Sequence, residues 1–196
     1  MENNTIAFFG IAGSGKGTQV KLLTDFLQNK DQKECIYAYP GNEYRKLVQA
    51  DGYVGQLIKD SLSLGHLQPD FLTNALVVNI LATSLSPEKN LIFDGYPRTL
   101  DQSIVLESMV SFFKREKIKI IYIELSKEEA TKRMKLRGRD DDTDEGISKR
   151  FDEYVNKVVP AMNYFKDKAG YEILTINGEQ SIEAVHQDII NALNLN

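Results

Sequence analysis

Residues 5–18 read Thr-Ile-Ala-Phe-Phe-Gly-Ile-Ala-Gly-Ser-Gly-Lys-Gly-Thr, and this stretch decides the fold. Its apolar run, Ile6 to Phe9, predicts a buried strand, and the pattern that follows Lys16 predicts a helix. The glycine-rich turn between them leaves backbone N–H groups free to point at an anion. The helix adds its unpaired N-terminal donors and the positive end of its dipole. With the charge of Lys16 in the same place, the stretch predicts a site for a di- or triphosphate.

The spacing within this turn is that of a phosphate loop. Gly10, Gly15 and Lys16 match the pattern G-x-x-x-x-G-K. Gly17 stands where the pattern has serine or threonine, and Thr18 follows, so the usual contact between a hydroxyl and magnesium is not predicted. The competing interpretation is a glycine-rich turn with an exposed lysine. We prefer the phosphate loop because the strand, the spacing, the lysine and the helix all agree with it.

The composition restricts the class of protein. A chain of 196 residues with 42% apolar residues suits one globular domain, residues 1–196. With 24 basic and 28 acidic residues the net charge is −4, which argues against a general nucleic-acid binder. The single cysteine, Cys35, excludes an intrachain disulfide and a multi-cysteine zinc site. Neither a signal peptide nor a membrane span is predicted, so we expect a cytoplasmic protein without membrane partners, and a monomer.

Strands alternate with helices along the chain, which predicts an α/β fold with three layers, α/β/α, around a five-stranded parallel sheet. We expect Asn42 to cap the helix that follows the turn at Pro40. The predicted strands are 6–9, 34–39, 90–94, 119–125 and 172–176. The predicted helices are 15–29, 42–50, 53–64, 69–84, 99–115, 126–137, 145–168 with a bend near Pro160, and 181–193.

Charged residues gather where the strands of such a sheet would end, which is where its ligands bind. Asp94 ends the third predicted strand, so we expect it to hold Mg²⁺ or its waters rather than only to cap a helix. Phosphoryl transfer needs donors around spread negative charge, and arginine offers a planar fork to phosphate. The candidate arginines are Arg45, Arg98, Arg133, Arg137, Arg139 and Arg150.

Other polar groups carry weaker signals. The run Asp140–Asp142 could ligate a metal, but beside Arg137 and Arg139 an ionic hinge or a charge cluster at a helix N-terminus is the preferred interpretation. Neither His66 nor His186 has a partner pattern of a ligand or a base. No Ser/His/Asp or Cys/His set stands out, so nucleophilic hydrolysis has little support.

Taken in order, these motifs resemble the adenylate kinase family of nucleoside monophosphate kinases over nearly the whole chain. The resemblance rests on Gly10–Thr18, on Gly65-His-Leu-Gln-Pro-Asp70 and on Asp94-Gly-Tyr-Pro-Arg-Thr-Leu-Asp-Gln102. The ending Gly-Lys-Gly-Thr is similar to that of the family's own phosphate loop. The family implies a P-loop NTPase fold, ATP with Mg²⁺, a nucleoside monophosphate as acceptor, and a monophosphate-binding excursion at 40–80. It also implies a short lid at 138–144 without zinc.

The resemblance also implies a role for each residue. Asp94 organises Mg²⁺ through water, Gln102 bonds to the acceptor base, and Arg133 stacks on the donor adenine. The implied catalytic residues are Lys16, Asp94, Arg98, Arg137, Arg139 and Arg150. The implied ATP site is Gly13, Ser14, Gly15, Lys16, Gly17, Thr18, Arg133, Arg137 and Gln180. The implied acceptor site is Pro40, Gly41, Arg45, His66, Leu67, Gln68, Gly95, Tyr96, Arg98, Gln102, Arg139 and Arg150.

The sequence departs from the family in the acceptor half. Pro40, Asn42 and Phe71 stand where threonine, aspartate and an acid are usual. The preferred hypothesis is therefore a kinase that makes two ADP from ATP and AMP, with another monophosphate as a possible acceptor. A nucleotide-binding regulatory or assembly module without AMP kinase activity is the alternative. A kinase for a metabolite that is not a nucleotide shares the donor loop but not the acceptor pattern.

Overall fold

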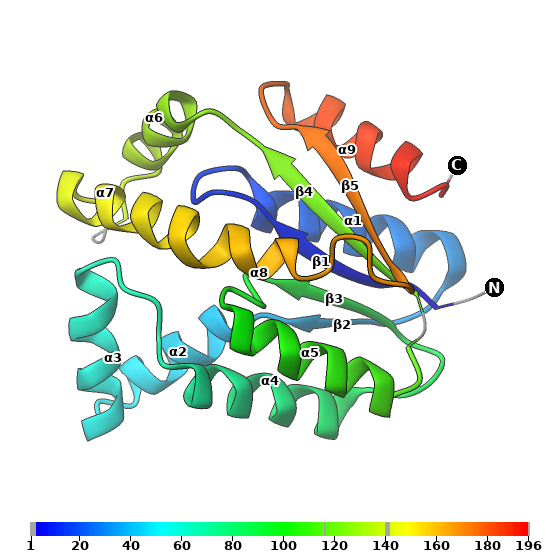
Figure 1. Ribbon diagram of the computed structural model, residues 1–196, viewed down its shortest axis with the longest axis horizontal. Coiled ribbons are helices and arrows are strands. Elements are labelled where there is room, and N and C mark those ends of the chain that lie inside the picture. Colours follow the sequence, from blue (N-terminus) through cyan, green and yellow to red (C-terminus); the bar gives the residue numbers. More distant parts are fainter. Residues whose placement is uncertain (1–2, 116, 140–141, 196) are drawn as a thin grey trace.

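A computed structural model describes residues 3–115, 117–139 and 142–195. A central parallel sheet has helices packed on both of its faces, as the alternation of strands and helices predicted (Figure 1). Its strands are β1 (Thr5–Phe9), β2 (Cys35–Ala38), β3 (Asn90–Asp94), β4 (Ile118–Glu124) and β5 (Tyr171–Asn177). The helices that surround it are α1 (Lys16–Asp31), α2 (Pro40–Gln49), α3 (Tyr53–Ser63), α4 (Asp70–Ser84), α5 (Leu100–Phe112), α6 (Lys127–Arg137), α7 (Asp144–Glu153), η1 (Tyr154–Val158), α8 (Val159–Asn163) and α9 (Ile182–Ala192).

The two faces of the sheet follow from the alternation of side chains along each strand. In β1, Ile6 and Phe8 point to the face that is covered by α1 and α9. Ala7 and Phe9 point to the opposite face, where α4, α5 and α8 pack. Every residue of β1 is buried, as expected for a central strand of a parallel sheet. The three layers predicted from the sequence are therefore present.

The order of the strands brings all their carboxyl ends to one edge. The sheet has the order β2-β3-β1-β4-β5, and every pair is parallel. The chain first moves to one side of β1 and then crosses it to β4, so β1 lies at the switch point of the topology. Ligands bind beyond the carboxyl ends at such a point. In Figure 1 this edge faces α6 and α7 on one side and α2 and α3 on the other.

The first part of the predicted 40–80 excursion stands outside the sheet layers. α2 and α3 pack against each other. Among the described residues, neither helix contributes to the hydrophobic clusters on the two faces of the sheet, whereas α4 contributes Val77 and Leu81. The prediction that Asn42 caps α2 is wrong. The helix begins at Pro40 after Tyr39, because proline has a suitable fixed φ and its missing N–H costs nothing in the first turn.

The long helix predicted for 145–168 is divided. α7 is followed by the π-helical segment η1 and then by α8, which ends at Asn163. Pro160 is the second residue of α8, two positions after the end of this irregular segment. Proline removes a helical hydrogen bond and its ring crowds the preceding turn, so the helix changes its hydrogen bonding there. Among the helices of the described residues, none is long and apolar enough to cross a membrane.

Candidate active site

The phosphate loop lies between β1 and the first turn of α1. Gly15, at the N-cap of α1, has φ of 88°, a left-handed conformation that glycine adopts without strain. No side chain caps this helix and no acidic residue lies in its first turn, so its backbone donors remain available to an anion. A Cβ on Gly13 would lie 2.7 Å from the carbonyl oxygen of Ala130. The loop is thus pressed against α6 by a contact that only glycine allows.

Lys16 turns back over this loop. Its Nζ donates hydrogen bonds to the carbonyl oxygens of Gly10 and Ile11, at 2.7 and 2.9 Å, and to Ser14 Oγ at 3.2 Å. Burial, and to a smaller extent the nearby guanidinium groups of two arginines, lowers the pKa of Lys16 to about 8 against the opposing effect of the Asp94 charge. These charged neighbours of Lys16 are Asp94, Arg98 and Arg137. The structure therefore brings the predicted catalytic lysine, acid and two of the arginines together.

Asp94 ends β3 and is 5% exposed. Tyr37 of the neighbouring strand β2 donates a hydrogen bond from its hydroxyl to Asp94 Oδ2, at 2.7 Å. The phenol keeps its proton, because burial, and then the negative charge of Asp94, raises the pKa of Tyr37. Tyr37 was not among the residues predicted from the sequence. Its position near the end of a predicted strand was a signal, but the pairing of β2 with β3 could not be read from the pattern.

On the acceptor side, Arg45 is turned toward its own helix. Its guanidinium donates to Asn42 Oδ1 and lies 5.2 Å from the centre of the Tyr39 ring. The Tyr39 ring covers Gly41, where a Cβ would lie 2.5 Å from a ring carbon. Tyr39 also stacks on Tyr37, with ring centres 5.4 Å apart. The predicted acceptor residues Gly41 and Arg45 thus lie together at the start of α2. They lie beside an aromatic pair, Tyr37 and Tyr39, that was not predicted from the sequence.

Arg98 and Gln102 form a second part of the acceptor side. The amide oxygen of Gln102 accepts from the backbone N–H of Arg98 at 2.8 Å, and its Nε2 donates to Asp70 Oδ1 at 2.7 Å. The Arg98 side chain donates from Nε to the carbonyl oxygen of Gly95 at 2.9 Å. The Tyr96 side chain is completely buried and bonds to Asn74, so in this structure it supports the site from within the core.

The segment before α4 links the excursion to α7. His66 Nδ1 lies 3.5 Å from Glu153 Oε1, and a Cβ on Gly65 would lie 2.7 Å from the carbonyl oxygen of Gly146. Gln68 is buried and donates to Ser61 Oγ. Leu67 and Gln68 line a surface pocket of about 470 Å³ between α4, α5 and η1. The loop predicted to contact the acceptor therefore connects α3 to α4 and also contacts α7, which lies above α3 in Figure 1.

Two arginines that flank the predicted lid converge on one carboxylate. Asp142 accepts from Arg137 at 2.7 and 3.0 Å and from Arg150 at 2.6 Å, and its side chain is 1% exposed. Burial alone would raise the pKa of Asp142, but the hydrogen bonds from Arg137 and Arg150 hold it below its usual value. The expected pairing of Asp142 with neighbouring arginines is thus confirmed; Asp140 and Asp141 lie outside the described residues. The Arg139 residue is exposed, and its backbone N–H bonds to Asp142 Oδ2.

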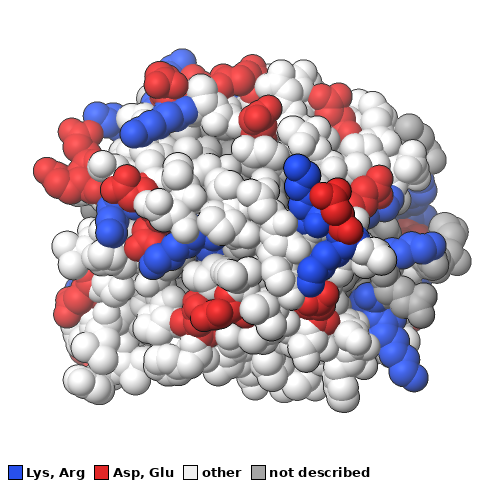
Figure 2. All heavy atoms as spheres, in the orientation of Figure 1, with Lys and Arg blue, Asp and Glu red and all other residues white. Residues whose placement is uncertain are grey.

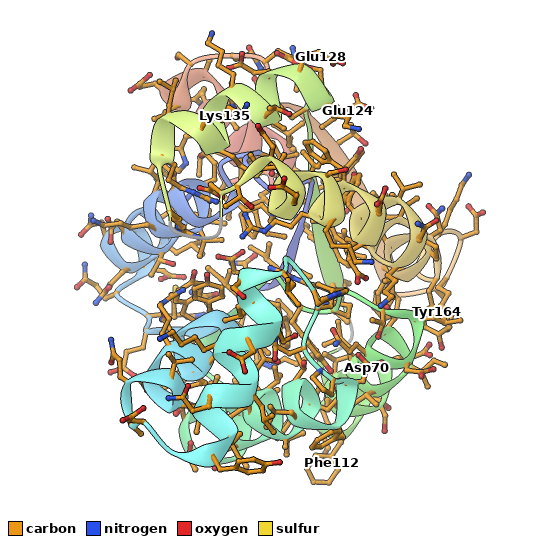
Figure 3. All side chains as sticks on the ribbon, turned by 90° about the vertical axis from the view of Figure 1, so that its left-hand side faces the viewer. Asp70, Phe112, Glu124, Glu128, Lys135 and Tyr164 are labelled. Atoms are coloured by element: carbon orange, nitrogen blue, oxygen red, sulfur yellow. The ribbon has the colours of Figure 1, made fainter. Side chains whose placement is uncertain are left out.

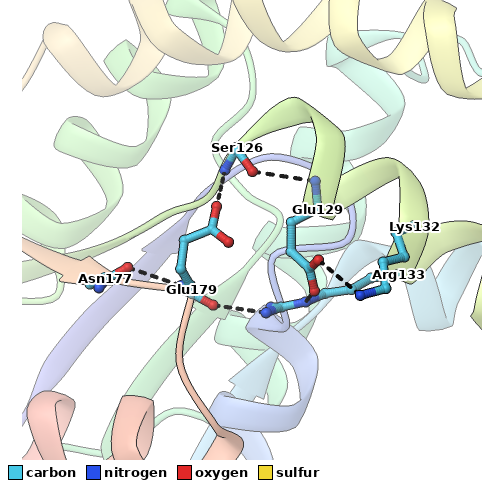
Figure 4. A network of polar contacts seen from close by, with 7 residues as sticks. Ser126, Glu129, Lys132, Arg133, Asn177 and Glu179 are labelled. Atoms are coloured by element: carbon cyan, nitrogen blue, oxygen red, sulfur yellow. Dashed lines mark hydrogen bonds and ion pairs between the residues drawn. The ribbon is translucent and has the colours of Figure 1, made fainter.

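Arg133 lies between α6 and the turn after β5. It pairs with Glu129 at 2.8 Å and donates to the carbonyl oxygen of Gly178 at 3.0 Å (Figure 4). Ser126 caps α6, where its hydroxyl accepts a hydrogen bond from the Glu129 N–H, and the Glu179 carboxylate accepts one from the Ser126 N–H. The Gln180 side chain bonds instead to Asp188 of α9 and to the Asn177 carbonyl oxygen. Of these two residues of the predicted ATP site, Arg133 is thus placed at this turn, while the Gln180 side chain turns to α9.

The halves of the site face each other across the edge of the sheet. Viewed from the side of α3 and α7, α6 lies above and α2 and α3 lie below (Figure 3). Ile11 of the phosphate loop shares a small apolar cluster with Met134 of α6 and Phe151 of α7, which fixes these helices around the loop. On the face in Figure 2, basic and acidic side chains lie next to one another in several places. The described residues contain no group of three His, Cys, Asp or Glu side chains that could form a metal cage.

A glycine-rich loop at a helix N-terminus, with a lysine inside it and a carboxylate on the neighbouring strand, defines a P-loop nucleotide-binding protein. The sequence model of the family described as Adenylate kinase matches residues 8–170. The chain belongs to the adenylate kinase family, and it is a nucleoside monophosphate kinase that takes its phosphoryl group from ATP.

Similar proteins are found in several bacteria. The adenylate kinase of Prochlorococcus marinus (strain MIT 9301) is 31% identical over 185 residues, which cover 94% of this chain and 95% of the relative. The adenylate kinase of Parabacteroides distasonis is 31% identical over 193 residues, covering 96% and 97%. That of Thermosipho melanesiensis is 26% identical over 219 aligned positions, covering 96% and 98%. The likeness thus extends over both the donor and the acceptor halves of the site.

Proposed function

We propose that the enzyme transfers the γ-phosphoryl group of ATP to AMP, with Mg²⁺, to give two molecules of ADP. The observation that carries this proposal is the set of charges around Lys16, which comes from three separate segments. Asp94 ends β3, Arg98 lies in the loop between β3 and α5 on the acceptor side, and Arg137 ends α6. A simple ATP-binding site has no need of an arginine from the acceptor side. An in-line transfer between two anionic phosphates does need one.

The proposed mechanism relies on placement and charge. The acceptor phosphate is already an anionic nucleophile, so no general base is required. Lys16 and the N–H groups of the first turn of α1 would bind the donor phosphates, while Arg98 and Arg45 would hold the acceptor phosphate. Arg137, Arg139 and Arg150 would surround the group in transit. Asp142 now occupies two of these guanidinium groups, so it stands where a phosphate oxygen would compete for them.

Water must be excluded, because it competes with the acceptor for the phosphoryl group. The contacts of His66 with Glu153 and of Gly65 with Gly146 support a closed state in which the excursion meets α7. All the residues proposed for both nucleotides come from one chain, which supports a monomer. The single cysteine and the use of ATP favour a cytoplasmic location.

The donor set at Asp94 suits magnesium. Carboxylate oxygen is a ligand that Mg²⁺ prefers, and this ion keeps several of its waters when it binds with a nucleotide. Asp94 lies beside Gly17, where a Cβ would be 3.7 Å from Oδ2, so its carboxylate is next to the phosphate-binding turn. When bound, the ion would neutralise charge on the phosphates. Asp94 is the residue proposed to hold it, through water.

The choice of AMP is supported by Gln102. Its amide oxygen and nitrogen are each held from one side, by the Arg98 N–H and by Asp70, which fixes which end is which. Each end can make one further hydrogen bond, so the amide would offer one acceptor and one donor in a fixed order. Such an edge distinguishes adenine, with its amino donor and ring acceptor, from guanine, in which the two are reversed.

A coupled assay with ATP, Mg²⁺ and equal concentrations of AMP, GMP, CMP and UMP tests this proposal. We expect AMP to give the highest kcat/KM. A higher value for another monophosphate would refute the choice of AMP, and no turnover with any of them would refute the mechanism. The alternative of a binding module without kinase activity is not supported, because the compared adenylate kinases match both halves of the chain.

A further inference from the structure

We propose that Tyr37 is a positioning residue for Asp94, which it holds so that one carboxylate oxygen stays turned to the metal of the metal–nucleotide complex. This inference rests on the proposed role of Asp94 toward magnesium. It assigns a function to a residue that no motif of the sequence indicated.

The geometry of the pair places the Tyr37 hydroxyl on the Asp94 carboxylate. The Tyr37 hydroxyl donates to Asp94 Oδ2 at 2.7 Å, and within the described residues no other side chain donates a hydrogen bond to Asp94. In the register of β2 and β3, Tyr37 lies opposite Ile92, two residues before Asp94, so both side chains point to the face covered by α1. The sheet itself therefore places the phenol beside the carboxylate.

The contact joins a phenol donor to a carboxylate acceptor. A tyrosine hydroxyl is a strong donor to a carboxylate, and bonds to a charged acceptor are about twice as strong as neutral ones. The bond uses one lone pair of Oδ2 and restricts the rotation of the carboxylate, and the remaining lone pairs stay available to the waters of a bound metal. Groups that orient a metal ligand in this way act on metal affinity although they never touch the ion.

Tyr37 is itself held in place by the aromatic ring of Tyr39. Its ring stacks on that of Tyr39, with 5.4 Å between the ring centres and 26° between the planes. The Arg45 guanidinium lies over the Tyr39 ring. Tyr39 in turn rests against Gly41 at the start of α2. The Tyr37 phenol is thus packed between the sheet and the start of α2, so the Asp94 carboxylate has a rigid support before any ligand binds.

The test measures metal binding separately from activity. Tyr37→Phe removes the hydroxyl and keeps the ring and its stacking. The affinity of the enzyme for ATP is measured by calorimetry in EDTA and in excess Mg²⁺, and Mn²⁺ binding to the enzyme–ATP complex is measured by electron paramagnetic resonance. We expect Tyr37→Phe to weaken Mn²⁺ binding by about tenfold, the lower end of the effect of such supporting groups. Its ATP affinity in EDTA should stay within about twofold of the parent, since the hydroxyl bonds to the metal-side acid and not to the phosphate loop.

Tyr164→Phe is the matched control. It also removes a tyrosine hydroxyl that is bonded to a carboxylate, that of Glu107, but on the contact of α8 with α5. Its metal affinity should equal that of the parent. Parent-like Mn²⁺ binding in a folded Tyr37→Phe would overturn the inference, as would an equal loss of ATP affinity with and without metal. If the parent fails to phosphorylate AMP while Tyr37→Phe still weakens Mn²⁺ binding, the proposed function falls and this inference stands.

Discussion

Arg137 grips Asp142 with two of its nitrogens, Nε at 3.0 Å and Nη2 at 2.7 Å, one to each oxygen of the carboxylate. This is the two-pronged geometry by which arginine also recognises a phosphate group. Arg150 reaches the same carboxylate at 2.6 Å. Before nucleotides bind, a protein carboxylate thus holds in place two of the guanidinium groups that we propose for the phosphoryl group in transit.

This arrangement predicts that Asp142→Asn lowers the stability of the ligand-free enzyme at neutral pH. The amide keeps the shape but not the charge, so two guanidinium groups lose a charged partner. We expect a loss of about 1–2 kcal/mol, because the arginines are partly exposed to water. The folded-state pKa of Asp142 is depressed, so its contribution is present above the unfolded-state pKa and is lost as the pH falls through the folded-state pKa.

Urea unfolding at pH 7 and at about pH 3 measures this effect. The matched control is Asp144→Asn, since Asp144 is 79% exposed and pairs with Lys135 only at the surface. Its change in unfolding free energy should be under about 0.5 kcal/mol. Equal stability of Asp142→Asn and the parent at pH 7 would show that the buried carboxylate does not stabilise the hinge.

A second prediction concerns the contact of the phosphate loop with α6. Gly13→Ala introduces a Cβ 2.7 Å from the Ala130 carbonyl oxygen, at a residue whose φ is +88°. The backbone must shift, so we expect about 2–3 kcal/mol of lost stability and a large loss of ATP affinity. Gly52→Ala is the control, because φ is −88° there and nothing lies within 4 Å of the new Cβ. If Gly13→Ala bound ATP as the parent does, the close approach would not matter for the site.

Much of the fold and of the donor half could be predicted from the sequence, because their signals are local. β3 spans the five predicted residues, and the turn from Gly10 to Lys16 carries its chemistry in adjacent positions. Tyr37 could not be found in this way. Its contact with Asp94 exists only because β2 pairs with β3, a choice of neighbour that depends on the packing of the whole sheet.

The start of α2 shows a second limit of local signals. Asn42 is a good capping residue by type, and Pro40 reads equally well as a turn or as the first residue of a helix. In the structure Pro40 is the first residue of α2, and the Asn42 side chain accepts a hydrogen bond from Arg45 instead of capping the helix. The division of the helix before Pro160 was anticipated as a bend, but the π-helical form of η1 depends on tertiary packing that no period in the sequence reports.

The lowered pKa of Lys16 predicts a link between pH and ATP binding. The ligand-free lysine, with a pKa of about 8, is largely charged at pH 7 and largely neutral at pH 9. Bound phosphates favour the charged form and raise this pKa, so ATP binding should take up a proton near and above pH 8. The affinity for ATP should be constant below pH 8 and should fall by up to about tenfold per pH unit above it.

Calorimetric titration with ATP in two buffers of different ionisation enthalpy counts the protons taken up. We expect under about half a proton at pH 7 and close to one at pH 9. Lys16→Met should abolish the difference between the two pH values. Proton uptake that is the same at both pH values in the parent would contradict the assignment to Lys16.

Removing the charge of Lys16 or of Arg98 should slow the chemical step. Both lie among the charges that face the proposed phosphoryl group, and each such donor contributes most in the transition state, when negative charge is spread over more oxygens. We expect Lys16→Met and Arg98→Ala each to lower kcat by about 10²–10³-fold in the assay with ATP and AMP. Lys21→Met, on the exposed side of α1, should leave kcat unchanged. A loss confined to KM for AMP in Arg98→Ala would place this arginine in acceptor binding alone, because an interaction that is equal in the ground state and the transition state changes KM without changing kcat.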